Sequence, residues 1–257
     1  MIKGEYHFMF TIEEQIPERF GKLNAGLDLG RVKPFVLAIT NSQGNRIAHY
    51  ETSGRLTQLN KKRERLIVEK KHILIKANQY EALGLGSSFL RSELGFKRNK
   101  ITVLGKVIAQ QLGSEVAKKL AKHEVNILKV EDLTWVTGNR YGSKWNHSTQ
   151  QVAISHAILR NGINTQKVNP KNTSQMCHKC GTAIVHNSNK RTVWCIGCKT
   201  SFDRDFNAAM NISKLKQRYP VSQRQNGDNP SAIAQVVENS SHNSYIRDTF
   251  SVTRKTT

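Results

Sequence analysis

All four cysteines of this 257-residue chain lie between residues 177 and 198, at a spacing that is typical of metal ligands. They form two C-x-x-C pairs, Cys177/Cys180 and Cys195/Cys198, which are separated by residues 181–194. Two such turns facing each other present four thiolates in a tetrahedron, which is the arrangement that structural Zn²⁺ prefers. A disulfide pair or a redox C-x-x-C motif would not explain two matched pairs. We therefore predict a closed, structural zinc site.

Three carboxylates occupy positions where an unpartnered acid would be costly. Asp28 lies in the apolar segment GLDLG, Glu131 ends the apolar segment VNILKVE, and Asp205 follows the second cysteine pair at a helix start. Asp28 could be a structural acid bonded to the backbone, or a metal ligand. If the three acids converge, they can bind two Mg²⁺ or Mn²⁺ ions about 3.5–4 Å apart and support in-line hydrolysis of a phosphodiester.

The elements that must position these acids alternate between strands and helices. The patterns predict strands at 4–12, three between 24 and 51, 125–133 and 163–168, and helices at 56–79, 99–123, 151–161 and 205–215. Residues 80–95 are predicted to be a break. The apolar stripe of the 99–123 helix, including Leu104, Ile108 and Leu112, is expected to pack in the core. This order predicts an α/β fold with an RNase H-like mixed sheet and flanking helices.

The composition favours a polyanionic partner. The chain has 40 Lys+Arg against 19 Asp+Glu and a formal net charge of +21, so nucleic acid is the expected partner and binding should weaken with salt. No apolar run approaches the roughly 20 residues of a spanning helix, and the N-terminus has no signal-peptide pattern. We expect a cytoplasmic, nucleoid-associated protein of a prokaryotic host, with no membrane partner.

Five motifs, taken together, resemble the RuvC nuclease half of TnpB, the transposon-encoded RNA-guided DNA endonucleases related to type V CRISPR effectors and Fanzor proteins. They are GLDLG at 26–30, VEDL at 130–133, NPKNTSQMCHKCG at 169–181, CIGC at 195–198 and DRDFNAAMNI at 203–212. The resemblance implies that Asp28, Glu131 and Asp205 are catalytic and bind Mg²⁺ or Mn²⁺. It makes Asp132 and Asp203 helpers or bystanders, and it implies guide RNA and target DNA as partners.

The resemblance divides the chain into segments up to residue 216, and the Ser/Asn/Gln-rich composition of residues 217–257 predicts the last one. These are a wedge-like strand and linker at 1–23, a RuvC-like domain at 24–172, an inserted zinc ribbon at 173–202, a final RuvC helix at 203–216 and a disordered tail at 217–257. A full TnpB also has a recognition lobe and a wedge domain, of which only residues 2–14 have a counterpart here. Either the chain is a minimal or truncated member of the family, or RNA or another chain supplies that lobe.

Basic and aromatic residues near these motifs are candidate nucleic-acid contacts. The candidates are Arg140, Lys144 and Trp145 in the polar loop 134–150, and Lys179, Lys190 and Arg191 in the ribbon. The tryptophans could equally pin the loop to the core. The charged 56–79 helix could be a solvated face or face nucleic acid.

Two other functions remain open at this point. One is an RNA-guided DNA-binding regulator that does not cut, although such relatives typically lose one of the three acids and all three are present here. The other is a RuvC-type transposase or resolvase without guide RNA, against which the ribbon directly before DRDFNAA argues. The prediction is a Mg²⁺-dependent, RNA-guided endodeoxyribonuclease.

Overall fold

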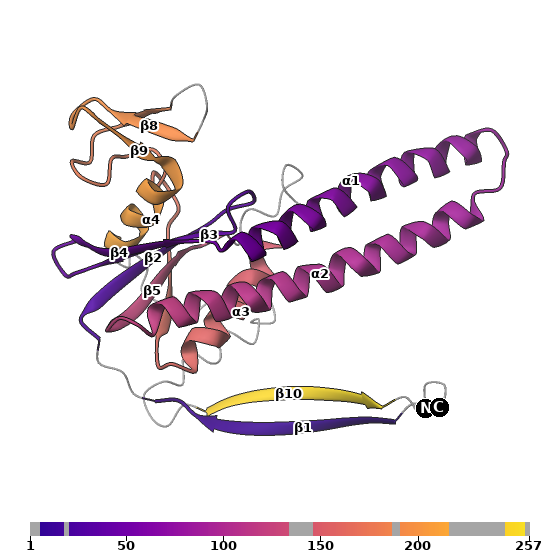
Figure 1. The fold of residues 1–257 in the computed structure, drawn as a ribbon, viewed down its shortest axis with the longest axis horizontal. Helices are drawn as coiled ribbons and strands as arrows, with labels where there is room; N and C mark the ends of the chain where they lie inside the picture. Colours follow the sequence, from indigo (N-terminus) through magenta and orange to yellow (C-terminus); the bar gives the residue numbers. More distant parts are fainter. Residues whose placement is uncertain (1–5, 18–20, 134–145, 187–190, 216–244, 255–257) are drawn as a thin grey trace, which may run out of the picture.

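The computed structural model describes residues 6–17, 21–133, 146–186, 191–215 and 245–254. Its centre is a five-stranded mixed sheet with the strand order β4-β3-β2-β5-β6 (Figure 1). Strands β2 (Leu23–Leu29), β3 (Phe35–Thr40) and β4 (Arg46–Glu51) are antiparallel neighbours, as the sequence predicts. Strands β5 (Val125–Glu131) and β6 (Asn164–Val168) extend the sheet in parallel with β2.

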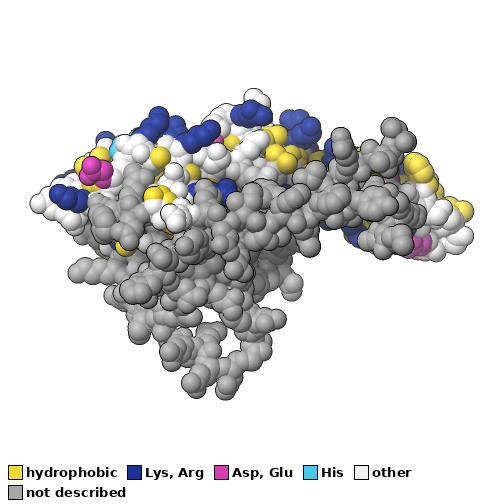
Figure 2. Space-filling view, turned by 90° about the horizontal axis from the view of Figure 1, so that it is seen from below, with side chains coloured by type: hydrophobic (Ala, Val, Ile, Leu, Met, Phe, Trp, Pro, Cys, Tyr) yellow, Lys and Arg dark blue, Asp and Glu magenta, His cyan; other side chains and the backbone are white. Residues whose placement is uncertain are grey.

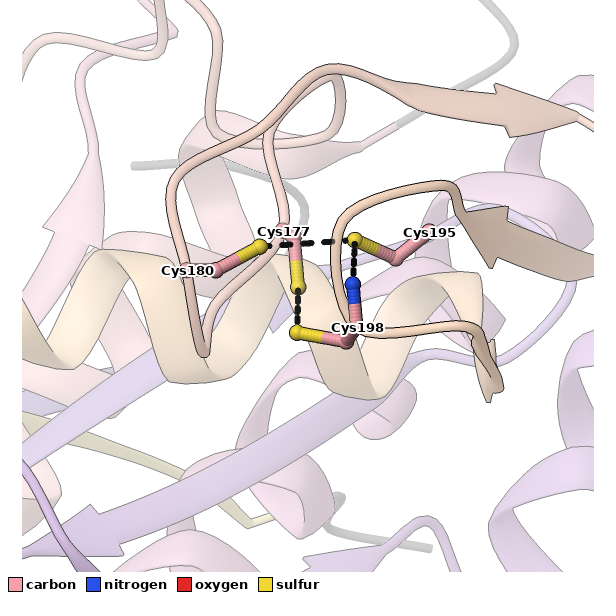
Figure 3. Close-up of side chains that lie close together, drawn as sticks. All are labelled: Cys177, Cys180, Cys195 and Cys198. Carbon is pink, nitrogen blue, oxygen red and sulfur yellow. Dashed lines mark hydrogen bonds between the residues drawn. The ribbon is translucent and has the colours of Figure 1, made fainter.

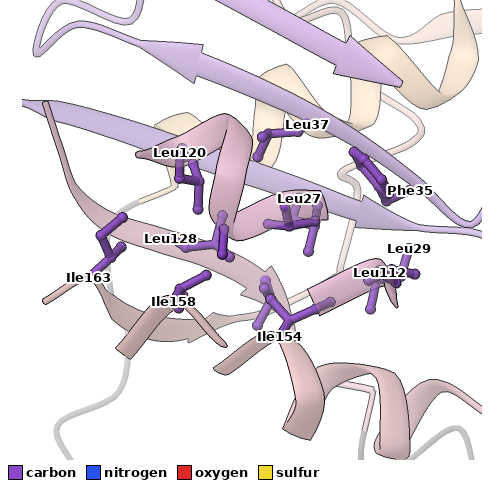
Figure 4. Packing of buried hydrophobic residues seen from close by; sticks show 14 of the residues in the cluster. Leu27, Leu29, Phe35, Leu37, Leu112, Leu120, Leu128, Ile154, Ile158 and Ile163 are labelled. Carbon is purple, nitrogen blue, oxygen red and sulfur yellow. The ribbon is translucent and has the colours of Figure 1, made fainter. Parts of the chain in front are cut away.

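Both faces of the sheet are covered, and all six residues of β3 are therefore buried. Alternate side chains of a strand point to opposite faces, so Phe35, Leu37 and Ile39 join one core cluster while Val36 and Ala38 join another. Helices α2 (Ser88–Leu120) and α3 (His147–Leu159) pack in the larger cluster (Figure 4). Helix α4 (Arg204–Lys214) covers the opposite face (Figure 1).

The contact between α4 and the sheet depends on one glycine. A Cβ at Gly26 would lie 2.2 Å from the carbonyl oxygen of Ala209 and 2.3 Å from the amide nitrogen of Ser213. Only glycine allows the helix backbone to approach β2 this closely. Since Asp28 is two residues further along β2, the same close approach brings the start of α4 towards that acid.

Helix α1 (Gly54–Ala82) and α2 form a long hairpin that extends beyond the sheet (Figure 1). The prediction of a break at residues 80–95 is wrong for most of that range, because the helices are interrupted only between Ala82 and Ser88. Gly84, at φ +71°, makes the turn, and Gly95 is accommodated inside α2. The apolar stripe is confirmed, since Ile108, Leu112 and the rest of its C-terminal half are buried in the core.

Strand β1 (Tyr6–Gln15) pairs with β10 (Tyr245–Arg254) in a separate antiparallel two-stranded sheet. The predicted disorder of residues 217–257 is therefore wrong for 245–254. The Ser/Asn/Gln-rich composition hid a short segment of β-branched and aromatic residues, YIRDTFSVTR. Its partner strand lies at the other end of the chain, so no local pattern could reveal the pairing.

A small three-stranded antiparallel sheet stands between β6 and α4 in the sequence. It consists of β7 (Ile184–His186), β8 (Thr192–Cys195) and β9 (Thr200–Asp203). Together with the turns that carry the cysteines, it forms the insert before α4. None of the helices in the described part of the chain combines the length and apolar character needed to cross a membrane.

Candidate functional site: an acidic pocket next to four cysteines

The three predicted acids line one pocket of about 1000 Å³. Strands β2 and β5 are parallel neighbours, so Asp28 and Glu131 emerge at the same edge of the sheet. Asp205 reaches this edge from the first turn of α4. The structure therefore brings together three side chains that lie far apart in the sequence.

The protein environment penalises negative charge in this pocket. The pKa of Asp28 is raised to about 8, mainly because burial removes the carboxylate from water and further because Glu131 and Asp205 repel it. Burial also raises the pKa of Glu131, against a smaller opposing effect from the hydroxyl of Thr173. A bound divalent metal would supply the positive charge that favours the ionised forms of Asp28 and Glu131.

Two arginines neutralise Asp205. Arg204 contacts the Oδ1 atom through Nε and Nη2 at 3.1 and 3.0 Å, and Arg191 Nη1 lies 3.4 Å from Oδ2. The Asp205 side chain is only 12% exposed. Both of its oxygens thus face guanidinium groups, and a metal ion at Asp205 would share or replace these contacts.

The neighbouring acids have different positions. Asp203 is the N-cap of α4: its Oδ1 accepts the backbone N–H groups of Asp205 and Phe206 at 2.9 and 3.0 Å, which satisfies two donors at the helix start. Its Oδ2 lies 3.1 Å from Lys33 Nζ. Asp132 is not among the residues that line the pocket and lies 4.0 Å from Lys167. Asp203 therefore positions the helix that carries Asp205, whereas Asp132 lies outside the lining of the pocket.

The oxygen donors fit hard divalent cations such as Mg²⁺ or Mn²⁺. Among the described residues, the four cysteines form a group whose ligand atoms lie close enough to hold one metal ion, and the three acids are not part of such a group. The pocket is also lined by basic side chains, namely Arg31, Lys33, Lys171, Arg191 and Arg204.

The four cysteines point towards one another from two turns (Figure 3). All four are free thiols. The sulfur atoms of Cys177 and Cys198 are 3.8 Å apart, and those of Cys180 and Cys195 are 3.4 Å apart. A zinc–sulfur bond of about 2.3 Å gives tetrahedron edges of about 3.8 Å. The cluster can therefore bind a metal ion such as Zn²⁺ without a large rearrangement.

The four thiols also need a bound cation if all of them are to be deprotonated. Hydrogen bonds between Cys180 and Thr182 lower the pKa of Cys180 to about 6, whereas Cys180, burial and the other thiols raise the pKa of Cys198 to about 12. Four thiolates cannot coexist at this distance unless a metal balances their charge. The backbone N–H groups of Lys179 and Cys198 point at Cys177 and Cys195, at 3.4 and 3.3 Å, and would stabilise the thiolate forms.

Two asparagines of α4 join the cysteine cluster to the acidic pocket. Asn207 is fully buried; its Nδ2 donates to the Met176 carbonyl at 2.8 Å, and its Oδ1 accepts from the backbone N–H of His178 at 2.9 Å. Asn211 Nδ2 donates to the carbonyls of Thr173 and Met176 at 2.8 and 2.7 Å. The turn that bears Cys177 is thereby bonded to the helix that bears Asp205.

Comparison with known proteins finds similar sequences and structures for this chain. Residues 147–212 match the Cas12f1-like, TNB domain family model. The chain is 27% identical over 206 residues to a CRISPR-associated endodeoxyribonuclease Cas12f1 from an uncultured archaeon, covering 74% of this chain and 37% of that protein. It is 33% identical over 105 residues to a TnpB-like protein of Methanocaldococcus jannaschii, covering 37% of each. A cryo-EM structure of a CRISPR-Cas12f ternary complex superposes with a TM-score of 0.58 at 26% identity, covering 78% of this chain and 40% of that one.

The chain is a relative of TnpB and of the type V CRISPR effectors. The resemblance to TnpB and the type V effectors is thus confirmed, and the mixed α/β fold is similar to the matched 40% of the Cas12f chain. The chain spans 37% of the length of each of the two curated relatives. The matched 147–212 region contains the four cysteines and Asp205.

Within this relative of TnpB, the predicted nucleic-acid contacts fall into two groups. Arg191 lines the acidic pocket, and Lys179 is exposed with its Nζ 5.2 Å from the centre of the Phe202 ring. The remaining candidates, Arg140, Lys144, Trp145 and Lys190, lie outside the described residues.

The structure adds pocket residues that sequence reasoning missed. Arg204 stands between the two acids of DRD, and Thr173 stands in the NPKNTSQ segment, so each belonged to a recognised motif. Their roles were hidden because a motif does not show which side chains contact each other. Lys33 lies in the β2–β3 turn and had no signal apart from its charge.

Proposed function

We propose that this chain carries the nuclease centre of an RNA-guided DNA endonuclease of TnpB type. The supporting observation is the convergence of Asp28, Glu131 and Asp205 in one pocket of a chain related to TnpB and Cas12f1. In this proposal the five-stranded sheet and α4 are an RNase H-like RuvC domain, and the three-stranded insert is a zinc ribbon. The strand order, with three antiparallel strands followed by two parallel ones, supports that assignment.

The three acids would hold two Mg²⁺ or Mn²⁺ ions, which supply an activated water and stabilise the leaving 3′ oxygen of the cleaved strand. Asp28 and Glu131 present carboxylates from the rigid edge of the sheet, and Asp205 presents its own from a capped helix start. Arg204 and Arg191 offset the charge of Asp205 and lie where a scissile phosphate would enter. Such fixed cations stabilise developing negative charge in phosphoryl transfer.

The four cysteines would bind a structural zinc ion. With zinc bound, the turns at 177–180 and 195–198 would become rigid. The hydrogen bonds from Asn207 and Asn211 to the Met176 carbonyl would then fix α4 relative to the first of these turns. The zinc ribbon would then fix where α4 begins, and therefore where Asp205 lies. Lys179, Lys190 and Arg191 would contact nucleic acid from the ribbon, and Arg140, Lys144 and Trp145 from the loop before α3.

Guide RNA and target DNA are the proposed partners. Lys and Arg prevail among the charged side chains on the described part of the face in Figure 2, in keeping with the net charge of +21. The relative from the uncultured archaeon is an endodeoxyribonuclease by name.

A plasmid-cleavage assay with the co-purified RNA and Mg²⁺ tests this function. Asp28→Asn, Glu131→Gln and Asp205→Asn should each lower the cleavage rate by at least about 10³-fold, in line with loss of a metal-centred charge in catalysis. Nucleic-acid binding should survive in all three. The matched acid-to-amide control is Asp132→Asn, which should cut at the wild-type rate.

The outcomes separate the alternatives. Wild-type cutting by the three acid variants would refute the assigned centre. Activity that is unchanged after the RNA is digested would favour a transposase or resolvase that needs no guide. Wild-type protein that binds DNA through its RNA yet never cuts would favour a DNA-binding regulator.

A further inference from the structure

Thr173 is a buried hydroxyl residue that joins two walls of the acidic pocket. It is 4% exposed and lies in the segment between β6 and the first cysteine. Its Oγ1 atom is 2.5 Å from Oε1 of Glu131, a residue of a different element. The next residue before it, Asn172, has a left-handed backbone with φ +67°. A non-glycine residue in that conformation needs surrounding contacts to maintain it.

The hydroxyl proton of Thr173 has two acceptors within reach. The Pro170 carbonyl lies 2.9 Å away, and Glu131 Oε1 lies closer. A hydroxyl has one proton to donate, and an ionised carboxylate is a stronger acceptor than a carbonyl. The proton therefore goes to Glu131 whenever that acid is ionised. This bond occupies Oε1 and leaves Oε2 for another partner.

Helix α4 holds Thr173 in place. The two N–H groups of Asn211 Nδ2 donate to the carbonyls of Thr173 and Met176, so this one side chain closes the 173–176 turn. On the main-chain side, Gln151 Nε2 of α3 donates to the Glu131 carbonyl at 2.8 Å. Both ends of Glu131 are thus fixed by residues outside β5.

We infer that Thr173 is a positioning residue for the Glu131 carboxylate and that Asn211 holds Thr173 in place for this role. Thr173 would act through Glu131, whose Oε1 it contacts, by orienting that carboxylate as a metal ligand. The inference rests on the proposed function, because it takes Glu131 as a metal ligand. Groups that orient metal ligands typically contribute 10- to 100-fold to metal affinity.

The expected consequence is a change in metal affinity without loss of the fold. Thr173→Val keeps the side-chain shape and removes the hydroxyl, so Mn²⁺ should bind about 10- to 100-fold more weakly. Thr173→Ser keeps the hydroxyl and should recover most of the affinity. Asn211→Ala leaves Thr173 intact and should weaken Mn²⁺ binding in the same direction. Thr102→Val is the matched control, because its hydroxyl donates only to the Arg98 carbonyl on an exposed helix.

The experiment is calorimetric titration of the full, zinc-loaded chain with MnCl₂ in the absence of nucleic acid. Cleavage rates as a function of Mg²⁺ concentration and the melting temperature are measured in parallel. We expect Thr173→Val to melt within a few degrees of the wild type, to bind Mn²⁺ weakly and to need more Mg²⁺ for half-maximal cleavage. Glu131→Gln provides the reference for loss of the ligand itself.

Three results would overturn the inference. The first is wild-type Mn²⁺ affinity in Thr173→Val while Glu131→Gln has lost it, a result that leaves the proposed function standing. The second is an equal loss in Thr173→Ser and Thr173→Val. The third is wild-type affinity in Asn211→Ala together with a Thr173→Val protein that does not fold. If Glu131→Gln itself leaves Mn²⁺ binding and cleavage unchanged, the proposed function fails as well.

Discussion

The two candidate metal sites of this molecule differ in how far apart their ligand residues lie along the chain. The four cysteines belong to one segment, 177–198, and their own turns bring them together. The acids come from β2, β5 and α4, and they meet only because the whole sheet has formed and Gly26 lets α4 approach it. The cysteine site therefore has little structure to support it without an ion, whereas the acidic pocket is part of the sheet itself.

The sites also differ in how the protein balances their charge. Arg204 and Arg191 face Asp205, so the acidic pocket carries part of its own countercharge. Among the described residues, the main causes of the shifted pKa values of Cys180, Cys195 and Cys198 include no Lys or Arg, and the pKa of Cys198 rises to about 12 because of its neighbouring thiols and its burial. Loss of metal should accordingly unfold the ribbon but leave the sheet intact. The predictions below test this contrast.

The largest effect is expected from Cys195→Ser. Cys195 is fully buried, and structural zinc in small zinc-binding domains contributes about 10–16 kcal/mol of apparent binding free energy. The variant should lose its zinc, and the amides of residues 176–186 and 191–203 should exchange with solvent at rates close to those of an unfolded chain. The amides of β2 and β3 should remain protected. Zinc content and hydrogen exchange by mass spectrometry measure both.

Ser201→Ala, an exposed change on β9, is the control for Cys195→Ser. It should retain zinc and protection. A zinc-free Cys195→Ser protein with a fully protected ribbon would show that the cysteine turns do not need their ion.

A smaller loss is expected from Asn207→Leu, which breaks the bond between the two sites. The change leaves the backbone N–H and Nδ1 of His178 without their acceptor, both in a buried position. Unsatisfied buried polar groups cost roughly 1–3 kcal/mol each, so the free energy of unfolding should fall by about 3–5 kcal/mol. Denaturant unfolding measures it, with Asn99→Leu on the exposed surface of α2 as the control. A loss below about 1 kcal/mol would mean that the ribbon and α4 are not coupled.

The contrast between the two sites also explains which structural features could be predicted from the sequence. The cysteine cluster was predictable because its ligands follow a local spacing, and the structure confirms that the four sulfurs meet. The antiparallel order of β2, β3 and β4 and the buried stripe of α2 were predictable because each follows from a short periodic pattern.

Non-local features were harder to predict. Each acid could be recognised as unusual in its own element, but its partners depended on which strands become neighbours. The order of the elements and the family resemblance indicated those neighbours. The bond from Thr173 to Glu131 and the cap that Asp203 forms depend on side-chain directions across elements, as does the contact of Lys33 with Asp203. Pairing of β10 with β1 joins the two ends of the chain. The catalytic role of the acids stays a prediction.

The acidic pocket should make the free energy of unfolding depend on pH. The pKa of Asp28 lies at about 8 in the folded chain and near 3.8 in the unfolded one, so the folded state retains a proton that the unfolded state releases. Without divalent metal, stability that is fully present below pH 3.8 is lost as the pH rises towards 8. Asp28→Asn cannot titrate, so its stability relative to the wild type should increase by about 2 kcal/mol between pH 6.0 and 7.5.

Denaturant unfolding of both proteins at each pH measures this difference, and the pH dependence of the cysteine site cancels because both proteins share it. Asp132→Asn, at a half-exposed acid outside the pocket, should follow the wild type at both pH values. Parallel curves for Asp28→Asn and the wild type would mean that Asp28 is already ionised in the metal-free pocket.

The smallest effect is expected from Lys33→Met, which removes a cation from the pocket wall. Lys33 Nζ bridges Asp203 and Glu51 at 3.1 and 3.2 Å, but its side chain is 28% exposed, and ion pairs of this kind contribute about 0–1 kcal/mol. Asp203→Ala removes the same bridge together with the helix cap, and so should cost about 1 kcal/mol more. Thermal unfolding at 0.1 and 1 M NaCl distinguishes the two contributions, because salt screens the ion pair and leaves the cap bonds largely unchanged. If Lys33→Met is as destabilising as Asp203→Ala, the start of α4 depends on the ion pair rather than on the cap.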